Sequence, residues 1–533
     1  YGERWWKPSE SPEKVRQAIE DTVKVYKRWL ELVPEGKVFL FNPEVHSCYG
    51  AWARGITESP LARLPGYEAI KEGGARAWRM AFDFFRKIHE EMRRRLGDKA
   101  ERFKVIAQLG RAAFQGAYVI HAGMDIVMQK NIHRHSINIV VANSRGAAKA
   151  YGKGYGFDFD CWNRQYWFSY HPREVWHGLL VYFHSGGQYI LDEIPVWNRK
   201  ENKPNKWGEV WLDFCRYVRL HPRRGEQVVR IAIMRALGDQ WVRAAGPSAS
   251  WEAGKWLPAE LEKVYKKPVG WPIEQRLFPE APEMWAKARK AVGEKGTVQV
   301  EDTYIWDFVL LNLVFANYGL PWRTNADRLC TGTPYGPVDF IPWDTPLKAL
   351  RQYEAVIFLG QGMVDKKTAQ NLKQFVRDGG RLVLAAGQLR GEDGRLVTDR
   401  FLSVKFGEKR EWKGLPYTLL VPLSPEAEVV YRLPNNDPLV VKVREGKGEA
   451  YIFCGEWLTY FDEWVPTKVI LPLLERAKML DFEPQSDWLE YMVRRKGESC
   501  IFAIFNHGRG FFPSGNGRAV SYTHLTLPTT ERV

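Results

Sequence analysis

The pattern of hydrophobic and polar positions in the first half of the chain alternates between two periods. Apolar runs at 125–130, 155–162 and 188–197 have the length of buried strands, whereas 137–152 and 173–187 carry apolar residues at helical spacing. Strands that alternate with helices across short connections predict a parallel sheet. The residues at the carboxyl ends of such strands line the ligand crevice.

The same alternation extends in both directions along the chain. Further helices are predicted at 12–33, 67–97, 111–123 and 209–222, and further strands at 37–44, 103–110 and 226–237. About six strands, each followed by a helix, within about 240 residues predict a (β/α)8 TIM barrel. One or two strands are missing from that count, and we expect them before Tyr1, in a barrel truncated at its N-terminus.

The second half of the chain predicts a separate α/β unit. Helices are expected at 304–320, 365–380 and 466–480, strands at 354–360 and 381–387, and hairpins at 438–455 and 488–508. The predicted division is a barrel at 1–245, a Pro- and Gly-rich linker at 246–295, the second α/β domain at 296–482 and a partial β-rich module at 483–520.

Composition and charge narrow the function. The 533 residues carry a formal charge of +15, but acidic residues interleave with the basic ones and no long basic arm occurs, so nucleic-acid binding is not expected. No run of eighteen apolar residues predicts a membrane span. The six cysteines form no CxxC pair, and no phosphate-binding glycine motif occurs, so no cofactor is expected. The 23 tryptophans suit the stacking of flat sugar faces.

Three segments of the second half carry a family resemblance. They are TPYGPVDFIPWDTPLKALRQYEAVIFLGQGMVD (333–365), LKQFVRDGGRLVLAAG (372–387) and VREGKGEAYIF (443–453). Together they resemble the flavodoxin-like, amidotransferase-like domain that follows the barrel in β-galactosidases of the trimerising type and in related glycosidases. The resemblance covers about a third of the chain and implies a glycosidase barrel before it. It also allows a homo-oligomer assembled through the second domain.

Two departures and one terminal feature qualify the resemblance. Gly360-Gln361-Gly362 stands where an amidotransferase would carry its cysteine, so glutaminase activity is not implied. The Asn-Glu pair that ends the fourth strand in many retaining glycosidases is absent from the barrel segment. Residues 521–533 resemble translated sequencing-adapter read-through, and we expect them to lie outside the fold.

Carboxylates at predicted strand ends are the catalytic candidates. Glycoside hydrolysis uses two carboxyl groups, one as acid and one as nucleophile or base. Glu193 follows Tyr189 and Leu191 on one face of its strand, which suits the attacking role. Asp158 and Asp160 share a face, and Asp160, nearer the mouth, is the preferred acid. Glu44 ends another strand and is the third candidate.

Basic and aromatic residues after the same strands are expected to bind the substrate. They are Lys130, His133, Arg145, Trp162, Arg164, Tyr166, Trp167 and Trp197. A competing interpretation of the pair His133 and His135 is a metal site, as in metal-dependent hydrolases, but no downstream ligand set accompanies it and no metal is expected.

The sequence therefore predicts an O-glycosyl hydrolase, β-galactosidase-like, with a carbohydrate substrate and neither a nucleic-acid nor a membrane partner. A carbohydrate-binding or assembly protein on a degenerate barrel is the alternative, and a metal-dependent hydrolase the third. The compartment, the sugar and the stereochemical outcome are left open.

Overall fold

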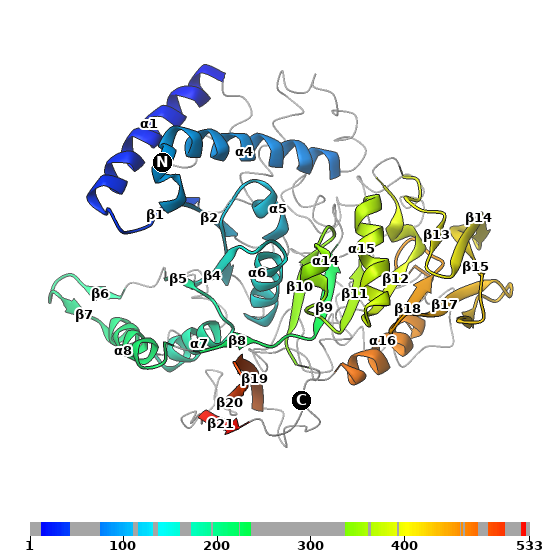
Figure 1. Ribbon diagram of the computed structural model, residues 1–533. Helices are drawn as coiled ribbons and strands as arrows, with labels where there is room; N and C mark the ends of the chain where they lie inside the picture. Colours follow the sequence, from blue (N-terminus) through cyan, green and yellow to red (C-terminus); the bar gives the residue numbers. More distant parts are fainter. Residues whose placement is uncertain are drawn as a thin grey trace.

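The computed structural model describes residues 12–42, 75–109, 116–131, 137–159, 172–192, 196–222, 224–235, 336–360, 364–391, 394–458, 460–461, 464–477, 489–506 and 524–528. Within these residues, a parallel sheet and a mixed, mostly parallel sheet lie on either side of helix α6 (Ile137–Tyr151) (Figure 1). The predicted linker and the predicted helix 304–320 lie outside the described residues. No described helix is both long enough and apolar enough to span a bilayer.

The first sheet holds five parallel strands in chain order. They are β1 (Val38–Asn42), β2 (Phe103–Leu109), β3 (Ile126–Asn131), β4 (Gly154–Phe159) and β5 (Tyr189–Asp192). The helices that alternate with them are α1 (Pro12–Leu32), α4 (Ala75–Leu96) with the 3-10 turn η3 (Gly97–Arg102), α5 (Gly116–His121), α6 and α7 (Pro172–His184). The predicted succession of strand and helix is confirmed here.

This five-stranded sheet is curled into a half-barrel. β1 and β5 are its two edges, and four strand spacings of about 4.8 Å would hold flat edges roughly 19 Å apart. The rings of Phe39 on β1 and Tyr189 on β5 nevertheless lie 5.7 Å apart, centroid to centroid. Next to this contact, Gly156 lets β4 and β5 lie close together, since a Cβ there would lie 2.2 Å from the carbonyl oxygen of Tyr189. The edges therefore bend toward each other across one concave face.

Helices cover the convex face. Val105, Ala107 and Val127 point from the strands into a core that includes residues of α1 and α4. Phe157 of β4 stacks on Tyr182 of α7, with ring centroids 4.2 Å apart and planes 12° from parallel. Because side chains alternate along a strand, the residues on either side of Phe157 face the concave side.

The second sheet has seven strands. Five are parallel, in the spatial order β10 (Val338–Pro342), β9 (Ile231–Arg235), β11 (Ala355–Leu359), β12 (Arg381–Ala385) and β18 (Gly448–Phe453). The antiparallel β17 (Pro438–Glu445) and β16 (Ala427–Arg432) extend it. Helices α14 (Leu347–Leu350), α15 (Lys366–Arg377) and α16 (Trp464–Arg476) and the 3-10 turn η6 (Ala386–Leu389) accompany these strands. The strands and hairpin predicted between 354 and 455 are confirmed.

The strand predicted at 226–237 belongs to the second sheet, whereas the sequence predicted it in the barrel. Residues 231–235 form β9, which pairs with β10 and β11 in the second sheet and not with the half-barrel. All five of its residues are buried. A continuous apolar run of this kind fits the centre of a parallel sheet that is covered on both faces. The predicted strand 188–197 is likewise divided, because β5 ends at Asp192.

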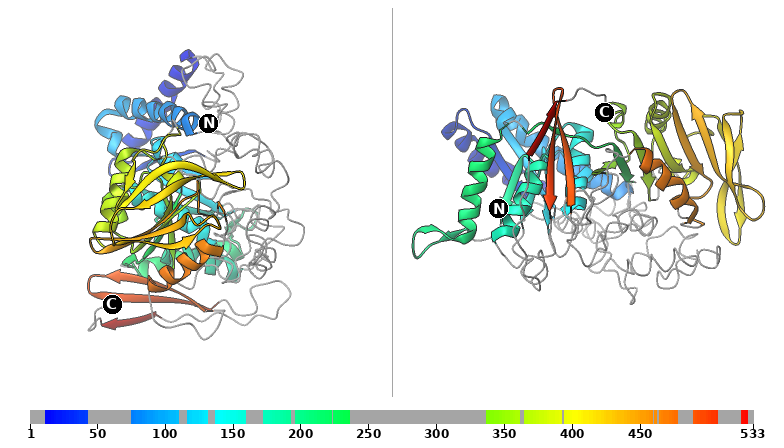
Figure 2. Two further views of the ribbon diagram at one scale, coloured as in Figure 1. Left: turned by 90° about the vertical axis from the view of Figure 1, so that its right-hand side faces the viewer. Right: turned by 90° about the horizontal axis from the view of Figure 1, so that it is seen from below.

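Smaller sheets complete the described structure. β6 (Trp197–Asn198) and β7 (Lys203–Pro204) form a hairpin before α8 (Lys206–Leu220), and β13 (Arg400–Phe401), β14 (Val404–Trp412) and β15 (Leu415–Pro422) pack on the second sheet. Figure 2 shows a further sheet of β19 (Leu489–Lys496), β20 (Ser499–Asn506) and β21 (His524–Pro528), which β8 (Glu226–Gln227) joins. The hairpin predicted at 488–508 is confirmed. The expectation that 521–533 lies outside the fold is wrong for β21, whose alternating sequence HLTLP suits an edge strand.

Two arginines attach β19 to the half-barrel. Arg494 donates hydrogen bonds to the carbonyl oxygens of His184, Arg224 and Gly225, and Arg224 donates to those of Phe183, Gly186 and Gly187. These acceptors include the last carbonyls of α7, which the helix itself leaves unsatisfied. The negative end of the helix dipole also favours the two cations.

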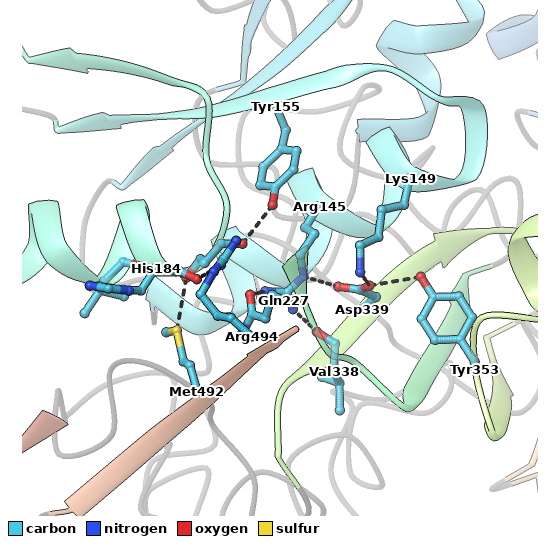
Figure 3. A network of polar contacts seen from close by, with 12 residues as sticks. Arg145, Lys149, Tyr155, His184, Gln227, Val338, Asp339, Tyr353, Met492 and Arg494 are labelled. Atoms are coloured by element: carbon cyan, nitrogen blue, oxygen red, sulfur yellow. Dashed lines mark hydrogen bonds and ion pairs between the residues drawn. The ribbon is translucent and has the colours of Figure 1, made fainter. Parts of the chain in front are cut away.

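Helix α6 is the contact between the half-barrel and the second sheet. A Cβ at Gly146 would lie 2.2 Å from the carbonyl oxygen of Phe340, so only glycine allows α6 to lie this close to β10. The neighbouring Arg145 is 2% exposed; its Nε lies 2.5 Å from Asp339 Oδ1, and it also donates to Gln227 and to the carbonyl of Val338 (Figure 3).

Asp339 stays ionised in this buried position. Burial raises the pKa of its carboxyl, but the charges of Arg145 and Lys149 and hydrogen bonds from Arg145 and Tyr353 outweigh burial and hold the pKa below its ordinary value. A second polar contact lies on the same seam, where Asp344 Oδ1 accepts one hydrogen bond from the Tyr151 hydroxyl and Asp344 Oδ2 lies 3.0 Å from His121 Nε2.

Replacing Gly146 with alanine should separate α6 from β10. The added methyl meets the Phe340 backbone, and overpacking of this kind costs about 1–3 kcal/mol, more than the gain in helix propensity of about 1 kcal/mol. Chemical denaturation should show a lower free energy of unfolding. Gly407→Ala is the control, since its Cβ would make only ordinary contacts with Leu419. Equal stability of both variants would contradict the close approach.

Removing Arg145 should destabilise the protein more than removing the whole ion pair. Arg145→Met leaves Asp339 charged and buried, at a cost of about 3–5 kcal/mol, whereas Arg145→Met with Asp339→Leu should cost less. The free energies of unfolding from denaturant titrations test this order. Arg216→Met, which breaks an exposed pair with Asp213, is the control and should change stability by less than about 1 kcal/mol.

The same pair predicts acid sensitivity with a definite sign. Because the pKa of Asp339 is lowered on folding, its contribution is fully present above about pH 4 and is lost as the pH falls further. The double variant should therefore lose less stability than the parent between pH 5 and pH 3. A parallel loss in both proteins would show that Asp339 contributes nothing to acid unfolding.

Candidate functional site at the carboxyl end of the half-barrel

The concave face of the half-barrel is apolar and partly aromatic. Its buried members are Ile106, Ile126 and Met128, and the partly buried side chains packed against them are Phe39, Phe41, Tyr189 and Leu191. These residues come from β1, β2, β3 and β5 at alternating positions, as strand geometry requires. They form a floor beneath the carboxyl ends of the strands, where parallel α/β folds bind ligands.

Asp158 stands on this face near the end of β4. Its side chain is fully buried, and Oδ2 accepts a hydrogen bond from Nε2 of Gln108 on β2. Gln108 is itself 1% exposed. An amide donor that is fixed in this way holds a carboxylate in one orientation. Asp158 therefore points away from Phe157, toward the concave side.

A second polar pair lies on the convex side of the same strand ends. Asn143 of α6 donates a 2.5 Å hydrogen bond to Gln129 of β3, and both residues are buried. Asn42, the last residue of β1, is buried and contacts Met124 Sδ at 3.7 Å. These amides and Gln108 were not among the site residues predicted from the sequence. The sequence did indicate them, since each is a polar amide that interrupts an otherwise apolar strand or helix.

Register places two further residues at this edge, and one of them, Lys130, was predicted to bind the substrate. Lys130 of β3 is the partner of Asp158, and Asp192 of β5 is the partner of Phe159. Lys130 thus comes to the same level as Asp158 along the strands. Nine other residues named above lie outside the described residues: Glu44, His133, His135, Asp160, Trp162, Arg164, Tyr166, Trp167 and Glu193.

Two predicted binding residues are placed away from the concave face. Arg145 lies on α6, where Asp339, Gln227 and Val338 occupy its guanidinium at the seam between the sheets. This corrects its expected position, because its acceptors come from distant parts of the chain. Trp197 lies on the β6–β7 hairpin, 48% exposed, rather than on the wall of the half-barrel.

The described part of this edge offers an oriented carboxylate above an aromatic floor. That combination suits a ligand with flat apolar faces and hydroxyl groups, such as a sugar. Within the described residues, no three His, Cys, Asp or Glu side chains gather as a metal site would require.

Replacing Gln108 should change the protein's stability through the buried carboxyl group of Asp158. Gln108→Leu removes an amide donor from a buried carboxylate and should lower the free energy of unfolding by about 1–3 kcal/mol. The near-isosteric Gln108→Glu places two carboxyls side by side, which raises the pKa of one of them. Since a raised folded-state pKa stabilises only at low pH, this variant should be less stable at pH 7 than at pH 5. A stability that is flat across this range would contradict the contact.

Comparison with known proteins finds similarity to solved structures alone. No protein-family model matches the chain. No curated protein matches it either. Among solved structures, the chain is similar to Gan42B, a GH42 beta-galactosidase from G. stearothermophilus, at 12% identity and a TM-score of 0.49, over 96% of this chain and 80% of that one.

Two further structures show similar likeness. A beta-galactosidase from Bacillus circulans sp. alkalophilus has 12% identity and a TM-score of 0.44, over 85% of this chain and 67% of that one. The alpha-L-fucosidase isoenzyme 2 from Paenibacillus thiaminolyticus has 8% identity and a TM-score of 0.45, over 92% of this chain and 70% of that one.

Proposed function

We propose that this protein is a glycoside hydrolase whose chemistry takes place at the carboxyl end of the half-barrel. The observation that carries the proposal is Asp158, a buried carboxylate that Gln108 orients on the concave face, above Phe39 and Tyr189. An aromatic floor suits the flat face of a sugar, and an oriented carboxylate marks the strand ends at which the two carboxyl groups that glycoside hydrolysis needs are proposed to lie.

The proposed roles follow from strand alternation. Tyr189 and Leu191 belong to the concave floor, and the next position of the same parity along the chain is Glu193, the proposed nucleophile or base. Asp160 has the parity of Asp158 and is the proposed acid. Asp158, being fully buried, suits a positioning role better than proton donation, and Glu44 is the remaining candidate for the second carboxyl.

We propose that the second sheet is a flavodoxin-like domain that serves packing or assembly. Its parallel strands have the spatial order second, first, third, fourth, fifth along the chain, which is the flavodoxin-like order. At their carboxyl ends the buried Gln388 accepts from the amide of Ala385 and donates to the carbonyls of Phe358 and Gly360. A side chain of the domain thus occupies the carboxyl ends of β11 and β12, which supports a structural role there.

One observation favours carbohydrate binding without turnover. Asp158 is completely buried, and a buried, hydrogen-bonded carboxylate is also what a structural residue would present. Binding of a glycan by the intact protein, with no hydrolysis of any substrate, would select this second function.

Turnover should depend on the two proposed carboxyls. Glu193→Gln and Asp160→Asn should each lower kcat on aryl glycosides by at least about a hundredfold, since each removes a group that acts in the transition state. Glu445→Gln, which alters a carboxylate paired with Arg377 in the second domain, is the control. A panel of aryl glycosides with different sugars, followed by released phenol, measures the effect. Unchanged turnover in both variants would reject the assignment.

A further inference from the structure

The hairpin that follows β5 exposes an unusual combination of side chains. Residues 196–207, here called the arm, comprise β6, β7 and the start of α8, and they project beside α8 (Figure 1). Trp197 is 48% exposed on the arm. Four cations accompany it, namely Arg199, Lys200, Lys203 and Lys206, all of them exposed, with Glu201 as the one acidic residue of the segment.

The arm is built to hold its shape. Asn198 Oδ1 accepts hydrogen bonds from the amides of Lys200 and Glu201, which fixes the turn. Asn205 Oδ1 accepts from the amides of Trp207 and Gly208 and so caps α8. A Cβ at Gly208 would lie 2.1 Å from the carbonyl oxygen of Val196, so the base of the arm is packed directly on the helix. The arm therefore displays its side chains in a fixed arrangement.

The charge on the arm is not balanced locally. Within the described part of the chain, only Lys203 of the four cations forms an ion pair, 2.9 Å from Glu201. Lys206 Nζ lies 4.6 Å from the ring centroid of Trp207. A rigid surface that combines an exposed indole with excess positive charge is suited to a ligand with flat apolar faces and negative charges.

The arm begins close to the proposed catalytic edge. Only residues 193–195 separate Asp192, the end of β5, from Val196. Even a fully extended chain limits the distance between those two Cα atoms to about 14 Å. A polymer that occupies the carboxyl end of the half-barrel can therefore continue over the arm.

We propose that the arm binds an acidic polysaccharide, with Trp197 stacked on a sugar ring and the cations paired with its carboxylates. This inference rests on the proposed function for its substrate class, and it makes the preferred glycan a uronate-containing chain. The arm supplies binding energy away from the bond that is cleaved.

The test uses polygalacturonate as the acidic polymer, neutral galactan as its uncharged counterpart and phosphatidylglycerol vesicles as a membrane. Isothermal titration of the full chain should show binding of polygalacturonate, weaker binding of galactan and none of the vesicles. Binding should fall in 1 M NaCl, where the Debye length is about 3 Å.

Two pairs of variants isolate the arm. Trp197→Ala should weaken polygalacturonate binding by about tenfold, since an exposed aromatic anchor carries much of such an interface. Trp29→Ala is the matched control, because Trp29 on α1 is 47% exposed and lies outside the arm. Arg199→Gln with Lys200→Gln should likewise weaken binding, whereas Lys27→Gln with Arg28→Gln on α1 should not.

Each contrary result overturns the proposal. If the Trp197 and Trp29 variants bind polygalacturonate with equal affinity, the arm is not part of the binding site. If the protein binds vesicles but not polygalacturonate, the surface is a membrane contact. The Glu193→Gln variant separates this test from the proposed hydrolysis, because it should bind polygalacturonate as the parent does. Binding through the arm without turnover on any glycoside would reject the hydrolysis alone.

Discussion

The close approach of α6 to β10 is the constraint on which the rest of the structure depends. Gly146 sets the distance, and the buried pair of Arg145 and Asp339 sets the register between helix and strand. Burying two charges is costly, so the pair serves to specify one arrangement more than to stabilise it. The same helix carries Asn143, whose amide bonds Gln129 near the strand ends of the half-barrel. The second sheet therefore influences the candidate site through one helix.

The order of strands and helices could be predicted from the sequence, but the sheet to which each strand belongs could not. Alternating periods predicted β3, α6, β4 and α7 because local burial dictates local pattern. The strand at 231–235 was assigned to the wrong sheet, since an apolar run shows that a strand is buried and not which neighbours bury it. Arg145 was misplaced for the same reason, because its carboxylate partner is 194 residues away. The face on which Asp158 lies follows from its position next to Phe157, since adjacent side chains of a strand point to opposite faces.

The candidate site combines local and distant contributions in the same way. Sequence alternation identifies the face on which Asp158 lies, but the donor that orients it, Gln108, comes from a strand 50 residues earlier. The curl of the sheet is also a long-range effect, because Phe39 and Tyr189 meet only when β1 and β5 bend together. Gly156 could have suggested the close approach of β4 and β5, since glycine inside a strand often marks a site where another backbone comes near.

The arm differs from the rest of the structure because it is ordered but displays its side chains to solvent. A single exposed tryptophan is ordinary on a protein surface, as Trp29 shows, so the proposal rests on the combination of Trp197 with four exposed cations on one ordered segment. Asn198, Asn205 and Gly208 hold the arm rigid without contributing a hydrophobic core. A segment that is already rigid loses little conformational entropy when a polymer binds, and this smaller entropic cost strengthens binding. Because only residues 193–195 lie between β5 and the arm, the chain itself limits how far the surface proposed to receive the rest of the glycan can lie from the end of that strand.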